Sequence, residues 1–296
     1  MSLAMRAVGW YLRLAKKPTW SSAERMMKYA HGPKKDAGPP AALRARHLLR
    51  ERTVAGFRSV TVLPRAGQPA RTVLYLHGGG YVGEISPEHW LLVSRLADAG
   101  VAVEVPLYGL APQHSFEEAY AFVTQVYREL LQDRDARTVT FIGDSAGGGL
   151  ALGFAQCLAA LGLPAPAALV LVAPWLDITC KNPEIEALEP HDPWLGRAGA
   201  IVAGRLWARG ADPDDPRLSP INGELRGLPP IEIYVGTRDI VYPDVRKLQQ
   251  RVVQAGAAGP RLEVTVCADA CHVYPLVPVR EGRAAAARIV QRVAAP

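Results

Sequence analysis

The strongest constraint on the fold is an alternation, from residue 53 onward, of short β-branched runs with segments of helical pattern. Several of these runs are apolar nearly throughout, as strands buried on both faces are. Strands alternating with helices predict an α/β fold, a mainly parallel central sheet flanked by helices. The predicted strands are SVTVL (59–63), TVLYL (72–76), VAVEV (101–105), TVTFI (138–142), ALVLV (168–172), IEIYV (231–235) and LEVTV (262–266).

Capping residues mark several of the predicted helices. Ser115 and Glu118 have the spacing of a capping box, and Ser86 precedes a proline that suits the first helical position. A helix over residues 243–255 is predicted to end at Gly256. No helix separates the first two predicted strands, which predicts an antiparallel hairpin at that edge of the sheet.

Two regions break the alternation. Residues 1–52 show no strand signal and have the pattern of basic, partly amphipathic helices. Residues 178–228 are rich in Pro, Asp and Trp and contain one helical piece near 196–209. Both regions are predicted to be additions to a sheet domain that spans residues 53–296.

Composition narrows the class of protein further. A chain of 296 residues suits one large domain with insertions, and no run approaches the 18 apolar residues of a membrane-spanning helix. Basic residues interrupt the apolar N-terminal run, which argues against a secretory signal. The cysteines are too few for a disulfide framework and predict reduced thiols in a cytoplasmic protein. They are Cys157, Cys180, Cys267 and Cys271.

Charge and ligand spacing bear on partners and metals. Residues 1–58 carry 13 Lys and Arg against three acids, a net +10, and the remainder is net −4. This basic segment has no nucleic-acid recognition motif, so nucleic-acid binding is not expected. Its Trp10, Tyr11 and Trp20 suit a weak contact with an anionic membrane surface. The C-x3-C-H cluster ending at His272 lacks a second half-site, and no metal is expected.

The stretch FIGDSAGGGLALG (141–153) admits three interpretations: a nucleophile, a helix cap or a phosphate-binding loop. A P-loop needs a lysine after its last glycine, and none follows Gly148 or Gly149. The dinucleotide fingerprint needs a glycine where Leu152 stands. Phosphate binding is therefore not expected.

The nucleophile interpretation places Ser145 on a tight strand-to-helix turn. Gly143 and Gly147 flank it in the pattern G-x-S-x-G, with a predicted strand before and a helical run after. Upstream, HGGG (77–80) follows another strand, where backbone N–H groups can face a developing oxyanion. The second donor would be the N–H of Ala146.

A serine nucleophile needs a base and an acid to orient that base. Among seven histidines, only His272 follows the last predicted strand, from which a loop can return to Ser145. Asp177 and Asp239 both follow strands, and Asp239 is better placed because its strand directly precedes the one before His272. Capping the next helix is the alternative role for Asp239. The order Ser145, Asp239, His272 is that of α/β-hydrolases.

Four segments, HGGG, GDSAGG, YGLAPQHSFEEA and APWLD, occur here in the order of one family's landmarks. The chain resembles the bacterial hormone-sensitive-lipase-like family of α/β-hydrolase carboxylesterases from about residue 71 to 290. The resemblance implies an α/β-hydrolase fold with a helical cap formed by residues 1–52 and 178–215. It also implies oxyanion donors at Gly79, Gly80 and Ala146, and supporting roles for His77, Gly78, Gly143, Asp144 and Gly147.

Three departures from the family pattern affect the expected site. The acid loop usually reads Asp-Pro-Leu, whereas here Ile240 and Val241 follow Asp239. Gly109 and Gln113 replace the usual arginine and glutamate, and Cys271 precedes the histidine. The triad residues remain, so the departures affect substrate shape and local stability.

The predicted function is a serine carboxylesterase for small to medium acyl esters, without cofactor or metal. A lactone hydrolase or an amide-cleaving relative would use the same triad, and a non-catalytic small-molecule receptor is the alternative outside enzymes. A homodimer stays open. Aromatic residues are candidates to line the pocket, although core packing explains each equally well. They are Tyr81, Trp175, Trp194, Trp207 and Tyr274.

Overall fold

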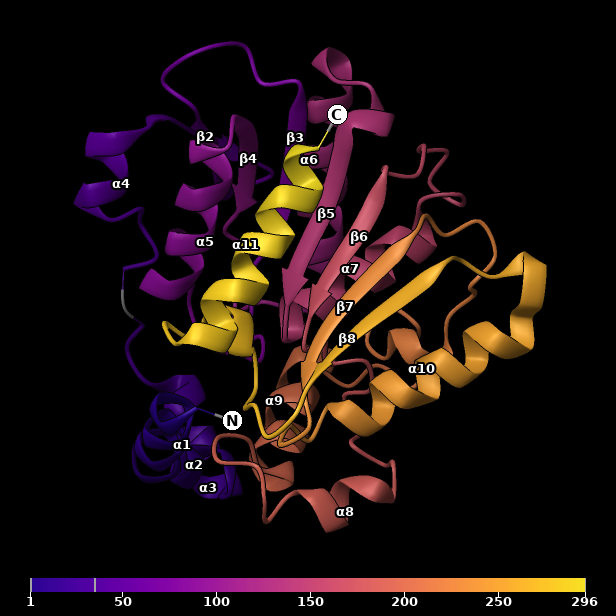
Figure 1. Cartoon of the computed structure of the whole chain (residues 1–296). Helices are drawn as coiled ribbons and strands as arrows, with labels where there is room; N and C mark the ends of the chain where they lie inside the picture. Colours follow the sequence, from indigo (N-terminus) through magenta and orange to yellow (C-terminus); the bar gives the residue numbers. More distant parts are fainter. Residues whose placement is uncertain (1, 35, 296) are drawn as a thin grey trace.

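The computed structural model describes residues 2–34 and 36–295. It contains an eight-stranded sheet with the order β1-β2-β4-β3-β5-β6-β7-β8. Figure 1 labels the strands from β2 to β8. Strand β2 runs antiparallel to both neighbours, and all pairs from β4 to β8 along this order are parallel. The strands are β1 (Leu48–Val54), β2 (Phe57–Leu63), β3 (Arg71–Leu76), β4 (Val101–Pro106), β5 (Val139–Asp144), β6 (Ala168–Val172), β7 (Ile231–Gly236) and β8 (Leu262–Cys267).

Helices cover both faces of this sheet. Helices α5 and α11 contact each other on one face, and α6, α7 and α10 cover the other (Figure 1). The central strands β3 and β5 are mostly apolar, and all their residues except Arg71 are buried between the helix layers, as expected for parallel strands. The helices are α1 (Leu3–Ala15), α2 (Lys17–Trp20), α3 (Ala23–His31), α4 (Ala41–Arg46), α5 (Pro87–Asp98), α6 (Phe116–Asp133), α7 (Ala146–Cys157), α8 (Glu184–Leu188), α9 (Arg197–Ala208), α10 (Tyr242–Ala255) and α11 (Arg280–Ala294).

The predicted α/β fold is confirmed, and all seven predicted strands form within two residues of their expected bounds. The capping box of Ser115 and Glu118 opens α6. Ser86 and His89 form a capping box at the start of α5, with His89 in the third helical position. Nδ1 of His89 accepts the N–H of Ser86. Helix α10 ends at Gly256, whose φ of +55° suits glycine.

Two predictions at the sheet edge are wrong. Residues 1–52 do contribute a strand, β1, whose sequence LLRERTV is mostly exposed and polar because it lies at the sheet edge. Its polar sequence hides it from a search for apolar runs, and it places the start of the sheet at Leu48. The antiparallel hairpin joins β1 to β2, not β2 to β3, through Ala55 and Gly56 at positive φ.

Helices α1, α2 and α3 and the 178–215 region lie together at one end of the sheet, at the bottom of Figure 1, whereas α4 lies apart from them, near α5. Helices α2 and α3 contact α9. The packing is close, because a Cβ added at Gly199 would lie 2.4 Å from the carbonyl oxygen of Trp20. In the described ranges, no helix is both long and apolar enough to cross a bilayer.

Candidate active site

Ser145 lies between the end of β5 and the start of α7, on a strained turn. Its φ of +52° and ψ of −120° are unusual for a residue with a side chain. The turn is fixed by backbone bonds: the Ser145 N–H donates to the Val172 carbonyl at 2.8 Å, and the Ser145 carbonyl accepts from Trp175 at 2.8 Å. These two backbone bonds therefore hold the strained serine in place at the carboxyl end of β5.

The two glycines of G-x-S-x-G are required by close backbone contacts. A Cβ on Gly143 would lie 2.3 Å from the Gly147 carbonyl oxygen. A Cβ on Gly147 would lie 2.0 Å from the carbonyl oxygen of Leu76 in β3. Both neighbours are backbone atoms, so no side chain can move aside to admit a larger residue.

The structure brings Ser145, His272 and Asp239 into one hydrogen-bonded row. The Ser145 hydroxyl is 2.8 Å from Nε2 of His272, and Nδ1 of His272 is 2.8 Å from Oδ2 of Asp239. Asp239 follows β7 and His272 follows β8, and their exposed fractions are 0% and 2%. With a carboxylate at Nδ1, the imidazole carries its proton there and leaves Nε2 free to accept from the serine.

Opposing effects set the pKa of His272. Burial favours the neutral ring and lowers the pKa, but the negative charge and hydrogen bond of Asp239 raise it. Asp192 and Asp144 raise it further, and the net pKa lies above the ordinary 6.5. An imidazolium formed beside Asp239 is therefore stabilised. The second oxygen of Asp239 accepts the Val241 N–H at 3.2 Å, which holds the carboxylate in place.

The HGGG loop lies beside the serine. Gly79 and Gly80 have φ of +123° and +63°, and a Cβ on Gly80 would lie 2.4 Å from the ring of Trp20. Among the described residues, no protein acceptor takes a hydrogen bond from the N–H of Gly79, Gly80 or Ala146. These three N–H groups therefore have no protein acceptor in competition with a ligand oxygen.

Asp144, beside the serine, joins the HGGG loop to the turn. Its Oδ1 accepts the Tyr75 hydroxyl at 2.8 Å and the Gly78 N–H at 3.0 Å, and its Oδ2 lies 3.0 Å from Nε2 of His89. Burial raises the pKa of Asp144, but His89 and these donors outweigh it and leave a lowered pKa. Sequence patterns gave no signal for His89, which only the packing of α5 brings here.

His77 is buried and stacks on Tyr108, with ring centroids 4.5 Å apart. Its Nδ1–H donates to the Gly78 carbonyl at 2.7 Å. Burial, with His89 nearby, lowers the pKa of His77 to about 4, so this ring is neutral at pH 7. These contacts support the loop, in line with the role that the resemblance implies for His77.

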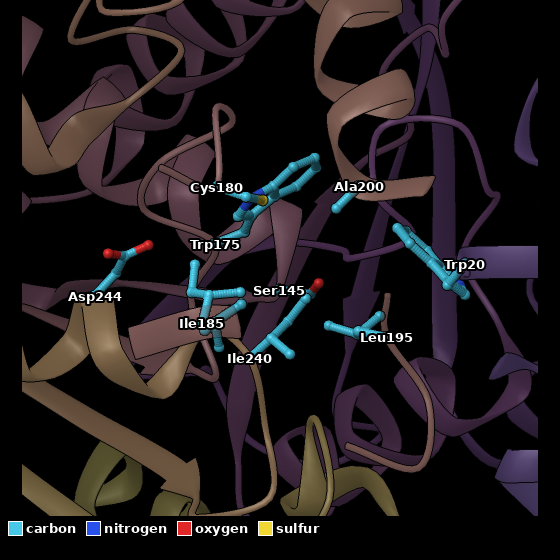
Figure 2. A pocket seen from close by; sticks show the side chains of 10 residues that line it. Trp20, Ser145, Trp175, Cys180, Ile185, Leu195, Ala200, Ile240 and Asp244 are labelled. Atoms are coloured by element: carbon cyan, nitrogen blue, oxygen red, sulfur yellow. The ribbon is translucent and has the colours of Figure 1, made fainter. Parts of the chain in front are cut away.

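A small, mostly apolar cavity opens at Ser145, and its volume is about 20 Å³. Figure 2 shows the side chains that line it. Such a volume holds roughly one water molecule or a small apolar group. Its walls come from the loops that follow β5, β6 and β7, from α2, from the start of α10 and from the 178–215 region. The lining residues are Trp20, Ser145, Trp175, Cys180, Ile185, Leu195, Ala200, Ile240, Val241 and Asp244.

Only one of the five predicted pocket aromatics, Trp175, lines this cavity. Tyr81 and Trp207 stack on each other behind it, with centroids 4.5 Å apart, because they pack in the core. Trp194 sits edge-on to the His272 ring at 5.6 Å, and Tyr274 is buried in the turn before α11. The aliphatic lining was not predicted, because nothing in an isolated Ile or Leu marks it as facing a cavity. Trp20, expected at a membrane surface, instead lines the cavity and packs against Gly80.

The cysteines are free thiols, and burial raises the pKa of Cys271 to about 12. Its Sγ lies 3.9 Å from Sδ of Met5, in an apolar contact between α1 and the histidine loop. Within residues 2–34 and 36–295, no group of three or more His, Cys, Asp or Glu is placed to hold a metal.

A mostly parallel sheet with a serine turn, an adjoining histidine and a buried aspartate defines the class of serine hydrolases with the α/β-hydrolase fold. Comparison with known proteins places the chain within that class. A family profile described as alpha/beta hydrolase fold matches residues 73–276, and the chain belongs to this family. An acetyl-hydrolase from Streptomyces hygroscopicus is 37% identical over 223 residues, 74% of either chain. An esterase from Acinetobacter venetianus is 29% identical over 211 residues, 70% of this chain and 69% of that one.

Solved structures agree with this assignment. An esterase/lipase from an uncultured bacterium has a TM-score of 0.83 and 29% identity, covering 99% of this chain and 98% of that one. An esterase from the bacterial hormone-sensitive lipase family has a TM-score of 0.82, 28% identity and the same coverage. The resemblance read from the motifs is confirmed, and the chain is a carboxylic ester hydrolase of this family.

Proposed function

We propose that Ser145, His272 and Asp239 form the catalytic triad of a serine carboxylesterase acting on small to medium acyl esters. The observation that carries the proposal is the unbroken row of hydrogen bonds, 2.8 Å from Ser145 to His272 and 2.8 Å from His272 to Asp239. A serine hydroxyl is a weak nucleophile unless an adjacent base takes its proton. The row supplies that base and orients it.

The reaction proceeds through an acyl-enzyme. Oγ of Ser145 attacks the ester carbonyl while Nε2 of His272 takes the serine proton, and the N–H groups of Gly79, Gly80 and Ala146 stabilise the oxyanion. Collapse breaks the bond to the alkoxy group, which leaves as the alcohol with the proton from His272. Water, deprotonated by His272, then attacks the acyl-enzyme. The tetrahedral intermediate formed by this attack collapses, which releases the acid, and His272 returns the proton to Ser145.

The acyl side of the substrate is expected to be short. The cavity at Ser145 measures about 20 Å³ and is walled by apolar side chains. Two relatives are named for acetyl substrates, the Streptomyces acetyl-hydrolase and an ethyl acetate hydrolase from Pseudomonas putida. Longer acyl chains would need side chains of the wall to move.

The decisive experiment is Ser145→Ala with a 4-nitrophenyl acetate assay. The triad predicts a fall in kcat of at least about 10⁴-fold, and a fluorophosphonate probe should label the wild type and not the variant. Ser94→Ala, on α5, is the matched control and should keep both signals. Ester hydrolysis at the wild-type rate by Ser145→Ala would refute the assignment.

Two alternatives separate in the same assays. A lactone or amide substrate would use the same triad, and a panel varying acyl length and ring closure ranks these against open esters. A non-catalytic small-molecule receptor would bind without turnover, and it would be supported by a folded wild type that resists the fluorophosphonate probe.

We also propose that α1–α3 and residues 178–215 act as a cap over the site. Support comes from α9 packing on α2 and α3, and from cavity walls that include Trp20, Ile185 and Leu195. This arrangement leaves the substrate entrance under control of both segments.

For partners, we propose a weak contact of α1 with anionic membrane surfaces. Leu3, Trp10 and Leu14 share one outward face of α1 and are 80%, 68% and 74% exposed, and Arg6 and Arg13 flank this face. Co-pelleting of the protein with anionic and with neutral vesicles tests this membrane contact. Equal pelleting with both kinds of vesicle would refute it. Sedimentation velocity of the same sample tests a homodimer. Four free thiols support a cytoplasmic location.

A further inference from the structure

We propose that Asp192 is a positioning residue for the acid of the triad, and that it acts through a hydrogen bond from the Ile240 N–H. The inference rests on the proposed function, because it concerns how Asp239 and His272 are held. Asp192 lies in the loop between α8 and α9, outside the sheet and outside every motif used to find the site.

The contacts of Asp192 join two distant segments. Its Oδ1 accepts the N–H groups of Trp194 at 2.7 Å and Leu195 at 2.9 Å, which closes its own loop. Its Oδ2 accepts the N–H of Ile240 at 2.9 Å. Ile240 directly follows Asp239, so this bond fixes the backbone that carries the catalytic carboxylate.

The loop of Asp192 also reaches the base. Trp194, two residues on, stands edge-on to the His272 ring at 5.6 Å and 86°. One short loop therefore restrains both the acid and the base. On its other side the loop meets α1, where a Cβ on Gly9 would lie 3.9 Å from Pro193 and Arg13 donates to the Pro190 carbonyl.

A carboxylate at this position carries a cost. Asp192 is fully buried, and its donors are neutral N–H groups. Burial, and next the negative charge of Asp239, raise the pKa of Asp192. A loop that needed only hydrogen-bond acceptors could use a neutral side chain. The negative charge instead adds to that of Asp239 when the imidazolium forms.

Several charged groups lie around Asp192 and His272 and affect the pH dependence of the reaction. Asp239, Asp192 and Asp144 face His272 and stabilise its protonated form. Asp192 itself is attracted by Lys17 of α2, whose ammonium donates to the carbonyls of Glu189 and Leu195.

Two further groups lie near this pair. The negative charges of Asp239 and Asp192 raise the pKa of the Cys271 thiol, and the positive charge of Arg238 lowers it. The Arg238 guanidinium donates a hydrogen bond to the His191 carbonyl.

The link depends on the residue at position 240, which supplies its donor. The family's acid loop usually reads Asp-Pro-Leu, and a proline has no N–H to donate. The isoleucine that replaces it supplies the donor that Asp192 accepts. The departure seen in the sequence therefore has a physical consequence: it couples the acid loop to the 178–215 region.

The test is a double-mutant cycle of Asp192→Asn and Ile240→Pro, with Glu186→Gln as control. Glu186 is an exposed acid of α8 in the same region. In Asp192→Asn the amide oxygen can still accept from Trp194 and Leu195, but its NH₂ then faces the Ile240 N–H. Loss of a charge-assisted bond predicts a fall in kcat/KM of roughly ten-fold or more.

The pH profile separates positioning with charge from simple structural damage. Removing the negative charge of Asp192 lowers the pKa of His272, so the acid limb of kcat/KM should move to lower pH in Asp192→Asn. Ile240→Pro keeps the negative charge of Asp192. It should lower kcat less than Asp192→Asn does, and the acid limb of kcat/KM should stay at the wild-type pH. The double variant should have a higher kcat/KM than Asp192→Asn. In the double variant the new NH₂ group no longer faces a backbone N–H at position 240. Glu186→Gln should match the wild type throughout.

Several results would overturn the inference. They are a folded Asp192→Asn with wild-type kcat/KM, a reduced rate with an unmoved acid limb, or strictly additive effects in the cycle. If Asp192→Asn does not fold, Ile240→Pro is sufficient as a test, because a wild-type kcat in that variant would overturn the inference. Activity surviving in Ser145→Ala would refute the proposed function instead, so the two failures are distinguishable.

Discussion

Replacing Gly147 by alanine tests the packing that creates the serine turn. The added Cβ would lie 2.0 Å from the carbonyl oxygen of Leu76 and 2.5 Å from that of His77. Contacts under 3.0 Å do not occur for real Cβ atoms, so α7 must move away from β3 by about 1 Å. Both oxygens belong to the backbone of a buried strand end, which cannot yield as a flexible side chain would.

The magnitude follows from this rigidity. Overpacking a well-packed site costs about 1 to 3 kcal/mol and occasionally more, and the backbone contacts put Gly147→Ala near the upper end, about 3 kcal/mol. With about 2.1 cal/mol/K of unfolding entropy per residue, this lowers the Tm of a chain this long by about 5 °C. Displacing α7 also moves Ser145 from His272, so fluorophosphonate labelling should slow at least about ten-fold.

Gly9→Ala is the matched control, since Gly9 also lies inside a helix. Its added Cβ would meet only Pro193, at an ordinary 3.9 Å. Replacing this helical glycine should leave labelling unchanged and raise the free energy of unfolding by about 0.5 to 1 kcal/mol. Thermal unfolding followed by circular dichroism, with a labelling time course, measures both variants. A wild-type Tm together with full labelling in Gly147→Ala would refute the reasoning.

Three further predictions follow from the site. The raised pKa of His272 means that kcat/KM should rise with pH through an apparent pKa above 6.5, because only the neutral ring can accept the serine proton; a limb below 6.5 would contradict this. Asp144→Asn should cost about 2 to 4 kcal/mol in urea unfolding at pH 7. The lowered pKa of Asp144 gives stability above its ordinary 3.8 that is lost as pH falls, so the difference from wild type should shrink in acid, and a constant difference would count against it. Ile185→Ala should widen the cavity and raise the ratio of hexanoate to acetate hydrolysis, whereas Ile289→Ala, buried in α11, should leave the ratio unchanged; equal ratios in both variants would contradict the assigned wall.

Local sequence signals were sufficient wherever a residue's role depends on its neighbours along the chain. The strand TVTFI, the glycines around Ser145 and the helical run after them predicted β5, the turn and α7. The capping box at Ser115 predicted the start of α6. Strand β1 was missed because an edge strand needs no apolar run, and the order of β2, β3 and β4 depends on a crossover that no local pattern encodes.

The sequence by itself predicted which three residues the structure joins by hydrogen bonds, because Ser145, Asp239 and His272 each follow a strand end in a set order. Tertiary structure decided what surrounds that chemistry. Four of the predicted aromatics lie outside the cavity, and Trp20 and several aliphatic side chains line it in their place. The packing of α5 also places His89 against Asp144. Tertiary structure also placed Asp192 against Ile240, 48 positions along the chain. Contacts between distant segments depend on how layers pack in three dimensions, and that arrangement leaves no periodic trace in the sequence.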